Sequence, residues 1–307
     1  MSPSFKSLKL FVFLTFCVGG VFSQGLFFSG PIGDRPLRLQ NAVSAPEQIR
    51  YDSGTASRPM RRKLFNHSQT LRGVKPKVAI VVDDFMYDPA RYATIFAVPV
   101  SLNMAVIPGF LHSRANALRA HALGHEVLIH MPMEALQHNM QRYPLKIMRG
   151  MSADQMMKTL TKAMDDVPFA CGLNNHVGSL ATSDKNLMAL FMGCYAKATE
   201  PLSERRYFLD SRTSGGSQAA TVAARLFIAS YHRDVFLDGQ TDTQYIQEKL
   251  HELVLIAKRH GSAIGICHVR PETMAVMARE LPRLSHEVEF VHVSSLLPDS
   301  GARFASR

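Results

Sequence analysis

Tryptophan is absent from this chain of 307 residues, and only four residues are cysteine. Charged residues make up 20% of the chain, and glycine and proline, with 19 and 16 residues, are at ordinary levels. This composition excludes fibrous and low-complexity proteins. Beyond Cys17, the cysteines Cys171, Cys194 and Cys267 form no CxxC or comparable spacing. The sequence therefore indicates neither a disulfide framework nor a thiolate zinc site, and buried thiols are expected.

The first 23 residues have the pattern of a secretory leader. Lys6 and Lys9 precede the apolar run LFVFLTFCVGGVF at 10–22, which is shorter than the roughly 20 residues that span a bilayer comfortably. We expect a signal peptide at residues 1–23, in preference to an uncleaved anchor, and export to the periplasm or the extracellular space.

A basic linker follows at residues 24–76. Proline and turn-forming residues interrupt every possible helix or strand there, which predicts a flexible segment. The linker holds nine basic and three acidic residues, whereas residues 77–307 hold 24 basic and 22 acidic ones. The formal net charge of +10 thus lies mostly outside the folding part and argues against a nucleic-acid partner. The basic cluster at 58–63 could contact a membrane surface weakly, although a solvated tether is favoured.

Residues 77–300 alternate between expected strands and helices. The run KVAIVV at 77–82 is typical of a strand buried on both faces of a parallel sheet. Further strands are expected at 100–107, 126–129, 170–173, 207–209, 235–237, 263–267 and 289–293, and helices at 90–97, 112–123, 152–166, 185–197, 219–226, 244–259 and 273–279. This order predicts a parallel α/β architecture in one barrel-like domain, with a short tail at 301–307. No glycine-rich loop follows the first strand, which argues against a nucleotide-binding Rossmann domain.

Polar side chains gather where the expected strands end. In parallel α/β barrels the active site is built at that end. In this chain the polar residues at the ends of the expected strands are Asp83, Asp84, His130, His176, Asp210, Arg233, Asp234 and His268. Alone, the two adjacent aspartates could be a simple turn pair, but packing rarely demands three histidines beside them. A carboxylate with two imidazoles suits a zinc-like ion with an open position, and a second carboxylate can serve as the base for its water.

Six segments carry a resemblance to a known family. In order they are VAIVVDDFMYD, EVLIHMPMEA, CGLNNHVGS, FLDSRTS, RDVFLD and AIGICHVRPET. Together they resemble the divergent branch of the polysaccharide deacetylase (carbohydrate esterase) superfamily over about residues 77–300. The resemblance implies an α/β fold, a distorted (β/α) barrel of about seven strands. It also implies a zinc-like ion that is used to hydrolyse N- or O-linked acetyl groups on polysaccharides or cell-wall glycans.

The resemblance also implies roles for individual residues. Asp83 matches the general base, Asp84 the metal-binding carboxylate, and His130 the first metal-binding histidine. His268 matches the late histidine that acts as general acid, and Asp234 is expected to orient it.

The resemblance assigns the third metal ligand less directly, because Glu134 stands four residues after His130, where most of the superfamily has its second histidine. His176 in the NNH segment is then the expected third ligand, with Glu134 as the alternative.

Other polar residues of these segments are expected to bind substrate or to tune the site. Either Arg212 or Arg233 could pair with Asp83 and adjust its basicity. Asn175 and Asp210 are likewise expected to bind substrate or to tune the site.

Two functions remain open on the sequence. The first is an exported hydrolase that uses a divalent metal, with zinc favoured, to remove acetyl groups from a glycan. The second is a catalytically inactive deacetylase-like module that binds a glycan or an envelope partner. The glutamate at position 134 and the missing tryptophan, often a sugar platform, favour the second slightly. Nothing in the sequence indicates an oligomeric state.

Overall fold

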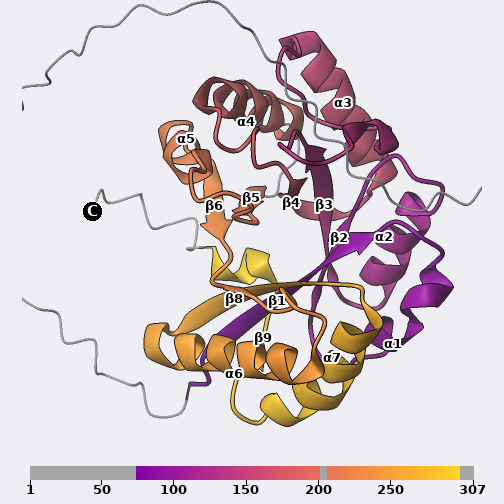
Figure 1. Cartoon of the computed structure of the whole chain (residues 1–307), viewed down its shortest axis with the longest axis vertical. Helices are drawn as coiled ribbons and strands as arrows, with labels where there is room; N and C mark the ends of the chain where they lie inside the picture. The colour runs from indigo at the N-terminus through magenta and orange to yellow at the C-terminus, as the bar shows by residue number, and fades with distance from the viewer. Residues whose placement is uncertain (1–73, 201–205, 298–307) are drawn as a thin grey trace, which may run out of the picture. The chain divides into compact units, whose positions relative to one another are not determined.

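A computed structural model describes residues 74–200 and 206–297 of the chain. Within these residues, a curled parallel sheet is surrounded by helices (Figure 1). The leader expected at 1–23, the tail expected at 301–307 and the linker up to residue 73 lie outside the described residues.

Nine strands of the described part of the chain form one sheet, in the order β6-β5-β4-β3-β2-β1-β8-β7, with β9 also beside β1. Every pairing between these strands is parallel, which confirms the predicted architecture. The strands are β1 Lys77–Phe85, β2 Asn103–Val106, β3 Glu126–Met133, β4 Ala170–Val177, β5 Tyr207–Asp210, β6 Ala229–His232, β7 Val235–Phe236, β8 Ser262–His268 and β9 Glu289–Phe290.

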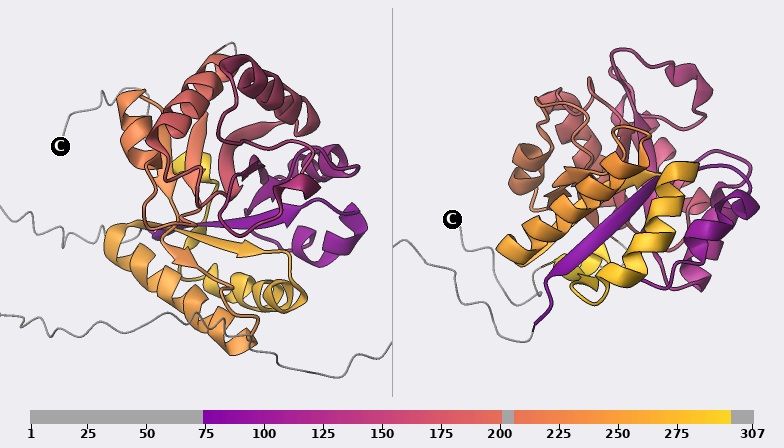
Figure 2. Two further views of the ribbon diagram at one scale, coloured as in Figure 1. Left: turned by 45° about the horizontal axis from the view of Figure 1, so that its top comes forward. Right: turned by 60° about the horizontal axis from the view of Figure 1, so that its bottom comes forward.

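The helices lie around the outside of the sheet (Figure 2). They are α1 Ala93–Phe96, α2 Ser113–Ala122, α3 Ala153–Asp166, α4 Lys185–Thr199, α5 Ala219–Arg225, α6 Thr243–His260 and α7 Pro271–Leu284, with short 3-10 helices η1 Pro89–Tyr92, η2 Met140–Arg142 and η3 Val293–Leu296. Ser152 and Gln155 form a capping box at the start of α3. None of the helices in the described residues is long and apolar enough to cross a membrane.

The chain between β6 and β7 closes the sheet into a distorted barrel. The backbone N–H of Arg233 donates to the Asp210 carbonyl on β5 (3.1 Å), and that of Asp234 donates to the Ile264 carbonyl on β8 (2.8 Å). Residues 229–236 therefore pair first with β5 and then with β8, the two sides that would otherwise be open edges. β6 was not predicted, because its four residues are only partly buried or exposed and carry no apolar run.

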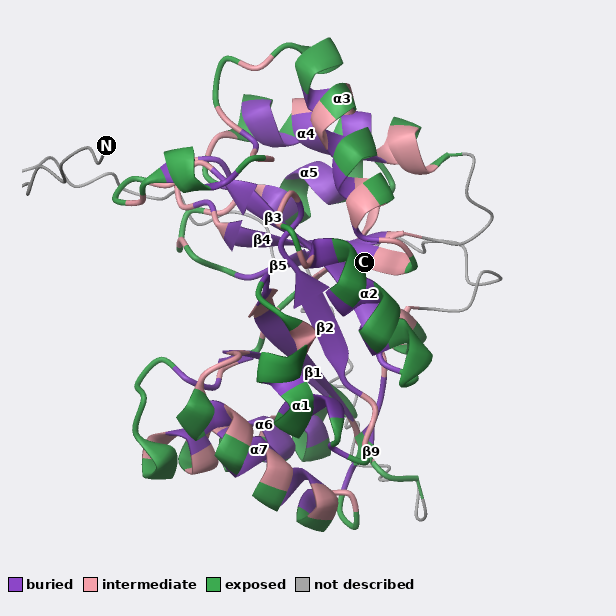
Figure 3. Ribbon diagram, turned by 90° about the vertical axis from the view of Figure 1, so that its right-hand side faces the viewer, coloured by how far each residue is buried: buried purple, intermediate pink, exposed green. Residues whose placement is uncertain are grey.

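The interior of the barrel is apolar at the amino ends of the strands. Alternate residues point inward because side chains of a strand alternate between the two faces of a sheet. The inward set is Ala79, Val81, Ala105, Leu128, Tyr207, Leu209, Ile264, Ile266, Val291 and Val293. The other face of the sheet packs against the helices, whose outer surfaces are exposed (Figure 3).

The same alternation carries the polar residues to the interior at the carboxyl ends. Asp83 follows Ala79 and Val81 at intervals of two, and His130 follows Leu128 in the same way. Three strands are longer than their apolar runs predict: β1 ends at Phe85, β3 at Met133 and β4 at Val177. Their last residues are polar or lie beside polar groups, so hydrophobicity alone does not reveal that the strands continue.

The close approach of β4 and β5 requires a glycine. The ring of Tyr207 is fully buried in the interior, and its hydroxyl donates to Oε1 of Glu126 (2.6 Å). A Cβ atom on Gly172 would lie 2.5 Å from this ring. The ring therefore occupies the space of the missing side chain.

We predict that Gly172→Ala lowers the free energy of unfolding by about 1–3 kcal/mol, the usual effect of overpacking a core. Gly193→Ala is the matched control, because Gly193 is exposed on α4 with nothing near its Cβ position; it should raise the free energy of unfolding by up to about 1 kcal/mol through helix propensity. Urea denaturation measures both. Equal stability of Gly172→Ala and wild type would contradict the contact with Tyr207.

Candidate metal centre

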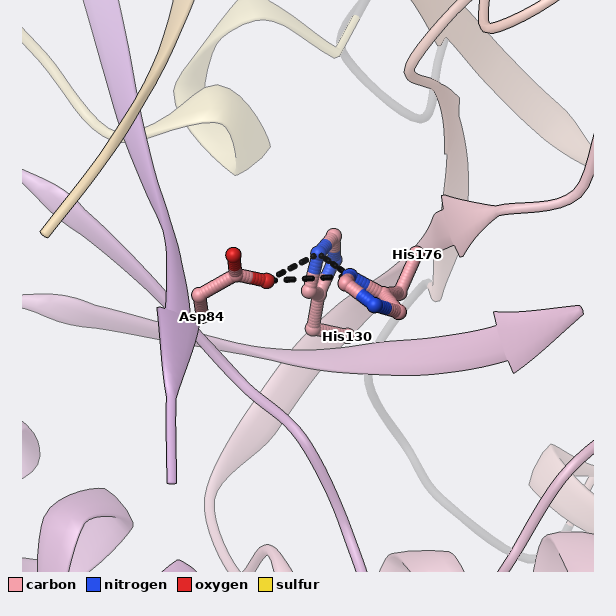
Figure 4. Close-up of side chains that lie close together, drawn as sticks. All are labelled: Asp84, His130 and His176. Carbon is pink, nitrogen blue, oxygen red and sulfur yellow. Dashed lines mark hydrogen bonds and ion pairs between the residues drawn. The ribbon is translucent and has the colours of Figure 1, made fainter. Parts of the chain in front are cut away.

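Three ligand atoms from three strands converge at the carboxyl end of the barrel (Figure 4). Oδ1 of Asp84 on β1 lies 3.3 Å from Nε2 of His130 on β3 and 2.9 Å from Nδ1 of His176 on β4. The two imidazole nitrogens are 3.0 Å apart. The structure thus brings together Asp84, His130 and His176, the set expected from the sequence.

A β-bulge turns Asp84 toward this centre. Val82 pairs with Met104 and Phe85 with Val106, so β1 has one residue more than β2 over this stretch. Asp84 takes up the difference in a left-handed conformation, with φ of 74°, which aspartate tolerates better than most residues. Bulges of this kind re-aim side chains beside active sites, and this one lets Asp84 join His130 and His176 while Asp83 keeps its inward position.

An amide fixes the proton of His130. Nδ1 of His130 lies 2.9 Å from Oδ1 of Asn174, and since that oxygen only accepts hydrogen bonds, Nδ1 carries the proton and Nε2 presents a lone pair to the centre. The amide nitrogen of Asn174 donates to Oδ1 of Asp83 (2.9 Å) and to Oγ of Ser211 (3.3 Å). Asn174 therefore links the candidate base to the first histidine.

The sequence indicates Asn175 for this region, but it is the neighbouring Asn174 that lies between Asp83 and His130. The Asn175 amide donates to the Val177 carbonyl (2.6 Å) and accepts from the backbone N–H of Ser211 (2.9 Å). It braces the loops after β4 and β5 rather than the three converging residues. Strand alternation was the available signal, because Asn174 and His176 lie two residues apart and share a face.

The environment sets the charge of each member of the centre. Burial raises the pKa of Asp84, but the facing imidazoles of His130 and His176 outweigh it and hold that pKa well below its usual range. Burial is the main cause that lowers the pKa of His176, and burial likewise raises the pKa of Asp83 against the opposing charges of His130 and His268. At His130, burial opposes protonation, but Asp83 and Asp84 outweigh it and raise the pKa. An anionic Asp84 beside a neutral His176 is a pair of the kind that suits a cation.

The donor set fits a divalent cation. Oδ1 of Asp84 is buried and, among the described residues, is aligned with no hydrogen-bond donor. A buried anionic oxygen without a donor is costly, and a cation would satisfy it. One carboxylate with two imidazoles is a set that zinc accepts while leaving a position open.

Glu134 is not part of the centre. The backbone N–H of Arg149 donates to Oε2 of Glu134 (2.6 Å), and the Arg149 side chain donates to Oε1 (3.3 and 3.2 Å). This pairing anchors the loop after β3 and occupies the carboxylate. Of the two candidates for the third position, the structure therefore brings His176, and not Glu134, to the centre.

His268 is oriented by Asp238, not by Asp234 as expected. Nδ1 of His268 lies 3.0 Å from Oδ1 of Asp238, and its backbone N–H donates to Oδ2 (2.8 Å). Thr273 donates to the same Oδ2 (3.0 Å). Asp234 instead accepts from the backbone N–H of Ile264 (2.8 Å) at the junction with β8. Both aspartates stand in the RDVFLD segment, and spacing alone did not separate them.

The two arginines lie at the rim without an ion pair to Asp83 in the described part of the chain. The Arg233 guanidinium donates to the Arg212 carbonyl (3.2 Å) and lies 4.5 Å from the centre of the Phe236 ring. Burial and the Arg212 charge lower the pKa of Arg233, and the Asp83 and Asp210 carboxylates oppose this. Arg233 thus interacts with Asp83 only through longer-range electrostatics. The expected direct pairing of either arginine with Asp83 is absent from the contacts of the described residues.

Asp210 has a local role at the end of β5. Its Oδ1 accepts the backbone N–H of Arg212 (2.8 Å). This bond stabilises the turn in which Arg212 has a left-handed φ of 50°, so Asp210 shapes the rim rather than entering the centre.

The fold and the site together define a parallel α/β barrel protein with an Asp-His-His cluster at the carboxyl ends of its strands. Residues 80–297 match the family described as divergent polysaccharide deacetylase, and the chain belongs to that family. This confirms the resemblance found in the six segments.

Two relatives are similar to this chain in sequence, and a solved structure is similar to it in fold. The chain is 35% identical over 247 residues to the uncharacterized protein YibQ of Escherichia coli strain K12, covering 78% of this chain and 74% of that protein. It is 36% identical over 221 residues to an uncharacterized protein of Haemophilus influenzae, covering 72% and 76%. The crystal structure of the uncharacterized protein ATU2773 from Agrobacterium tumefaciens C58 is similar in fold, with a TM-score of 0.67 at 23% identity over 74% of this chain and 91% of that one.

We predict that Asp238→Asn lowers the pKa of His268 in chelator-treated protein. Burial favours the neutral ring, but the Asp238 hydrogen bond and nearby carboxylates outweigh it and raise that pKa, so loss of the Asp238 charge should lower it. Asp234→Asn is the control and should leave the pKa unchanged. Titration of the His268 ring by NMR measures both, and a shift confined to Asp234→Asn would show that the wrong aspartate has been assigned.

Proposed function

We propose that this chain is an exported, metal-dependent hydrolase that removes acetyl groups from a glycan. The observation that carries the proposal is the convergence of Asp84, His130 and His176 beside a second buried carboxylate, Asp83. His268 supports it, because it is the register partner of Asp83 on the adjacent strand β8. Base and acid thus stand next to the three candidate ligands.

Asp84, His130 and His176 would hold the cation, and zinc is favoured because one carboxylate and two imidazoles leave a tetrahedral position open. When bound, such an ion supplies Lewis-acid activation of a water molecule and of the acetyl carbonyl.

Asp83 is suited to take the proton of the attacking water. Its Oδ2 lies 3.6 Å from Nε2 of His130, and its Oδ1 is held by Asn174, so one oxygen is fixed and the other faces the centre. The raised pKa of Asp83, caused by burial, makes it a stronger base than an exposed aspartate, which favours proton transfer in the neutral range.

His268 is suited to protonate the departing amine or hydroxyl. Its Nδ1 is taken by Asp238, which leaves Nε2 to donate. The Asp238 hydrogen bond overcomes burial and raises the pKa of His268, so the ring holds a proton more readily than usual. The two groups thus have environments that favour opposite proton movements.

The substrate class and the compartment are parts of the proposal. Membership of the divergent polysaccharide deacetylase family supports an acetylated glycan, and the leader-like residues 1–23 support export to the periplasm or beyond. The basic linker would then act as a tether. Glu134 gives less support to the inactive binding module, because Asp84, His130 and His176 form a group that could hold a metal ion without it.

Asp83→Asn and His130→Ala should separate catalysis from metal binding. Asp83→Asn retains the three candidate ligands and is expected to purify with zinc, but to lose turnover on the order of 10²–10⁴-fold with its general base. His130→Ala is expected to lose both. Elemental analysis measures the metal, and acetate release from N- and O-acetylated oligosaccharides measures turnover. Full activity and full metal content in both variants would refute the proposal.

Zinc should also stabilise the fold through this site alone. At 100 times its dissociation constant, a ligand that binds only the folded state adds about 2.7 kcal/mol to the free energy of unfolding. We expect this gain in wild type and in His251→Ala, whose histidine is exposed on α6, and not in His130→Ala. Denaturation with and without zinc tests it; an equal gain in all three proteins would place the zinc elsewhere.

A further inference from the structure

A tyrosine and a third histidine extend the centre on the side away from the candidate ion. The hydroxyl of Tyr143, which follows η2, lies 2.6 Å from Nε2 of His176 and 2.9 Å from Nε2 of His138. Tyr143 is 1% exposed, and His138 is partly exposed. His176, Tyr143 and His138 thus form a hydrogen-bonded chain from the centre toward the protein surface.

The proton of His176 has two possible places, and they have opposite effects on the centre. With the proton on Nδ1, the ring donates to the lone pair of His130 Nε2, 3.0 Å away, and the position between the ligands is blocked. With the proton on Nε2, Nδ1 offers a lone pair to a cation, and Nε2 needs an acceptor in a buried place. The acceptor at that place is the Tyr143 hydroxyl.

A hydroxyl can serve either arrangement because it both donates and accepts. While His176 is protonated on Nδ1, the chain runs from His138 through Tyr143 to His176 and on to His130. When His176 must be protonated on Nε2, the chain runs the other way, and Nε2 of His138 becomes the final acceptor. His138 then carries its proton on Nδ1. The groups that hydrogen-bond the other ring nitrogen of a metal-binding histidine are usually carboxylates, carbonyls or water. Of these, only water could reverse its hydrogen bonds in this way.

We propose that Tyr143 is a positioning residue of the metal centre, and that cation binding reverses the Tyr143 hydrogen bonds and moves the proton of His138 from Nε2 to Nδ1. This inference rests on the proposed metal centre. The protons balance as follows: His176 releases its Nδ1 proton to solvent and receives the Tyr143 hydroxyl proton on Nε2. Tyr143 receives the Nε2 proton of His138, and His138 takes one proton from solvent on Nδ1. All three residues end neutral with the number of protons they had before.

The first test is the zinc affinity of the full chain with Tyr143→Phe, which removes only the hydroxyl. We expect a ten- to hundredfold larger dissociation constant, the usual effect of losing such a hydrogen-bond partner. The matched control is Tyr195→Phe. Tyr195 is also buried, and its hydroxyl donates to the Tyr207 carbonyl (3.2 Å) at the start of β5, so this variant should bind zinc like wild type. Unfolding curves without zinc compare the stability of both variants.

The second test reads the tautomer of His138, which is not a candidate ligand. At about pH 8, nitrogen NMR should show the His138 proton move from Nε2 to Nδ1 when zinc is added to wild type. In Tyr143→Phe the tautomer should not respond. A purely structural role for Tyr143 would leave this signal unaffected by zinc in both proteins.

His138 variants keep the inference testable if Tyr143→Phe does not fold. His138→Leu removes the end of the chain and should weaken zinc binding several-fold, whereas the His138→Gln amide both donates and accepts and should restore it. If wild type binds zinc but Tyr143→Phe binds it with the same affinity, or if the His138 tautomer does not change, the proposed role of Tyr143 and His138 is overturned while the metal centre stands. If wild type does not bind zinc, the metal centre and the role of Tyr143 and His138 are overturned together.

Discussion

The site depends on one extra residue in β1. Without the bulge, Asp84 would follow Val78, Ile80 and Val82 onto the face that packs against the helices, where a carboxylate has no partner. The left-handed conformation of Asp84 removes it from that series, and Phe85 takes the outward place instead. Two adjacent carboxylates can therefore serve one centre, although strand alternation would separate them.

Placing charge inside a barrel requires that each charged group find a partner. Asp83 is 2% exposed and His130 is 2% exposed, and the amide of Asn174 bonds to both side chains. Asp238, which is fully buried, is satisfied by His268 and Thr273. The remaining oxygen without a donor in this region of the described chain is Oδ1 of Asp84. The hydrogen bonds thus compensate the carboxylates of Asp83 and Asp238 and leave one anionic oxygen, Oδ1 of Asp84, available to a cation.

The sequence predicts the parallel barrel well because its strands begin with apolar, β-branched runs such as KVAIVV at 77–82. It also predicts that Asp84, His130 and His176 lie close together, since these side chains stand at strand ends that must meet. It cannot place Tyr143, which belongs to a loop and reaches His176 across 33 positions. It cannot choose Asp238 over Asp234 either, because β7 is only two residues long and the path beyond it follows no period.

Glu134 shows how a candidate ligand set can be completed from a neighbouring strand. A ligand four residues after His130 would come from the same strand and its loop, but here Arg149 pairs with Glu134 and holds that loop. The third group comes from the neighbouring strand, because Pro132 and His176 are register partners of β3 and β4. The loop after β3 instead contributes Tyr143, whose hydroxyl lies behind His176. The three converging side chains are therefore assembled from β1, β3 and β4 without a second histidine on β3.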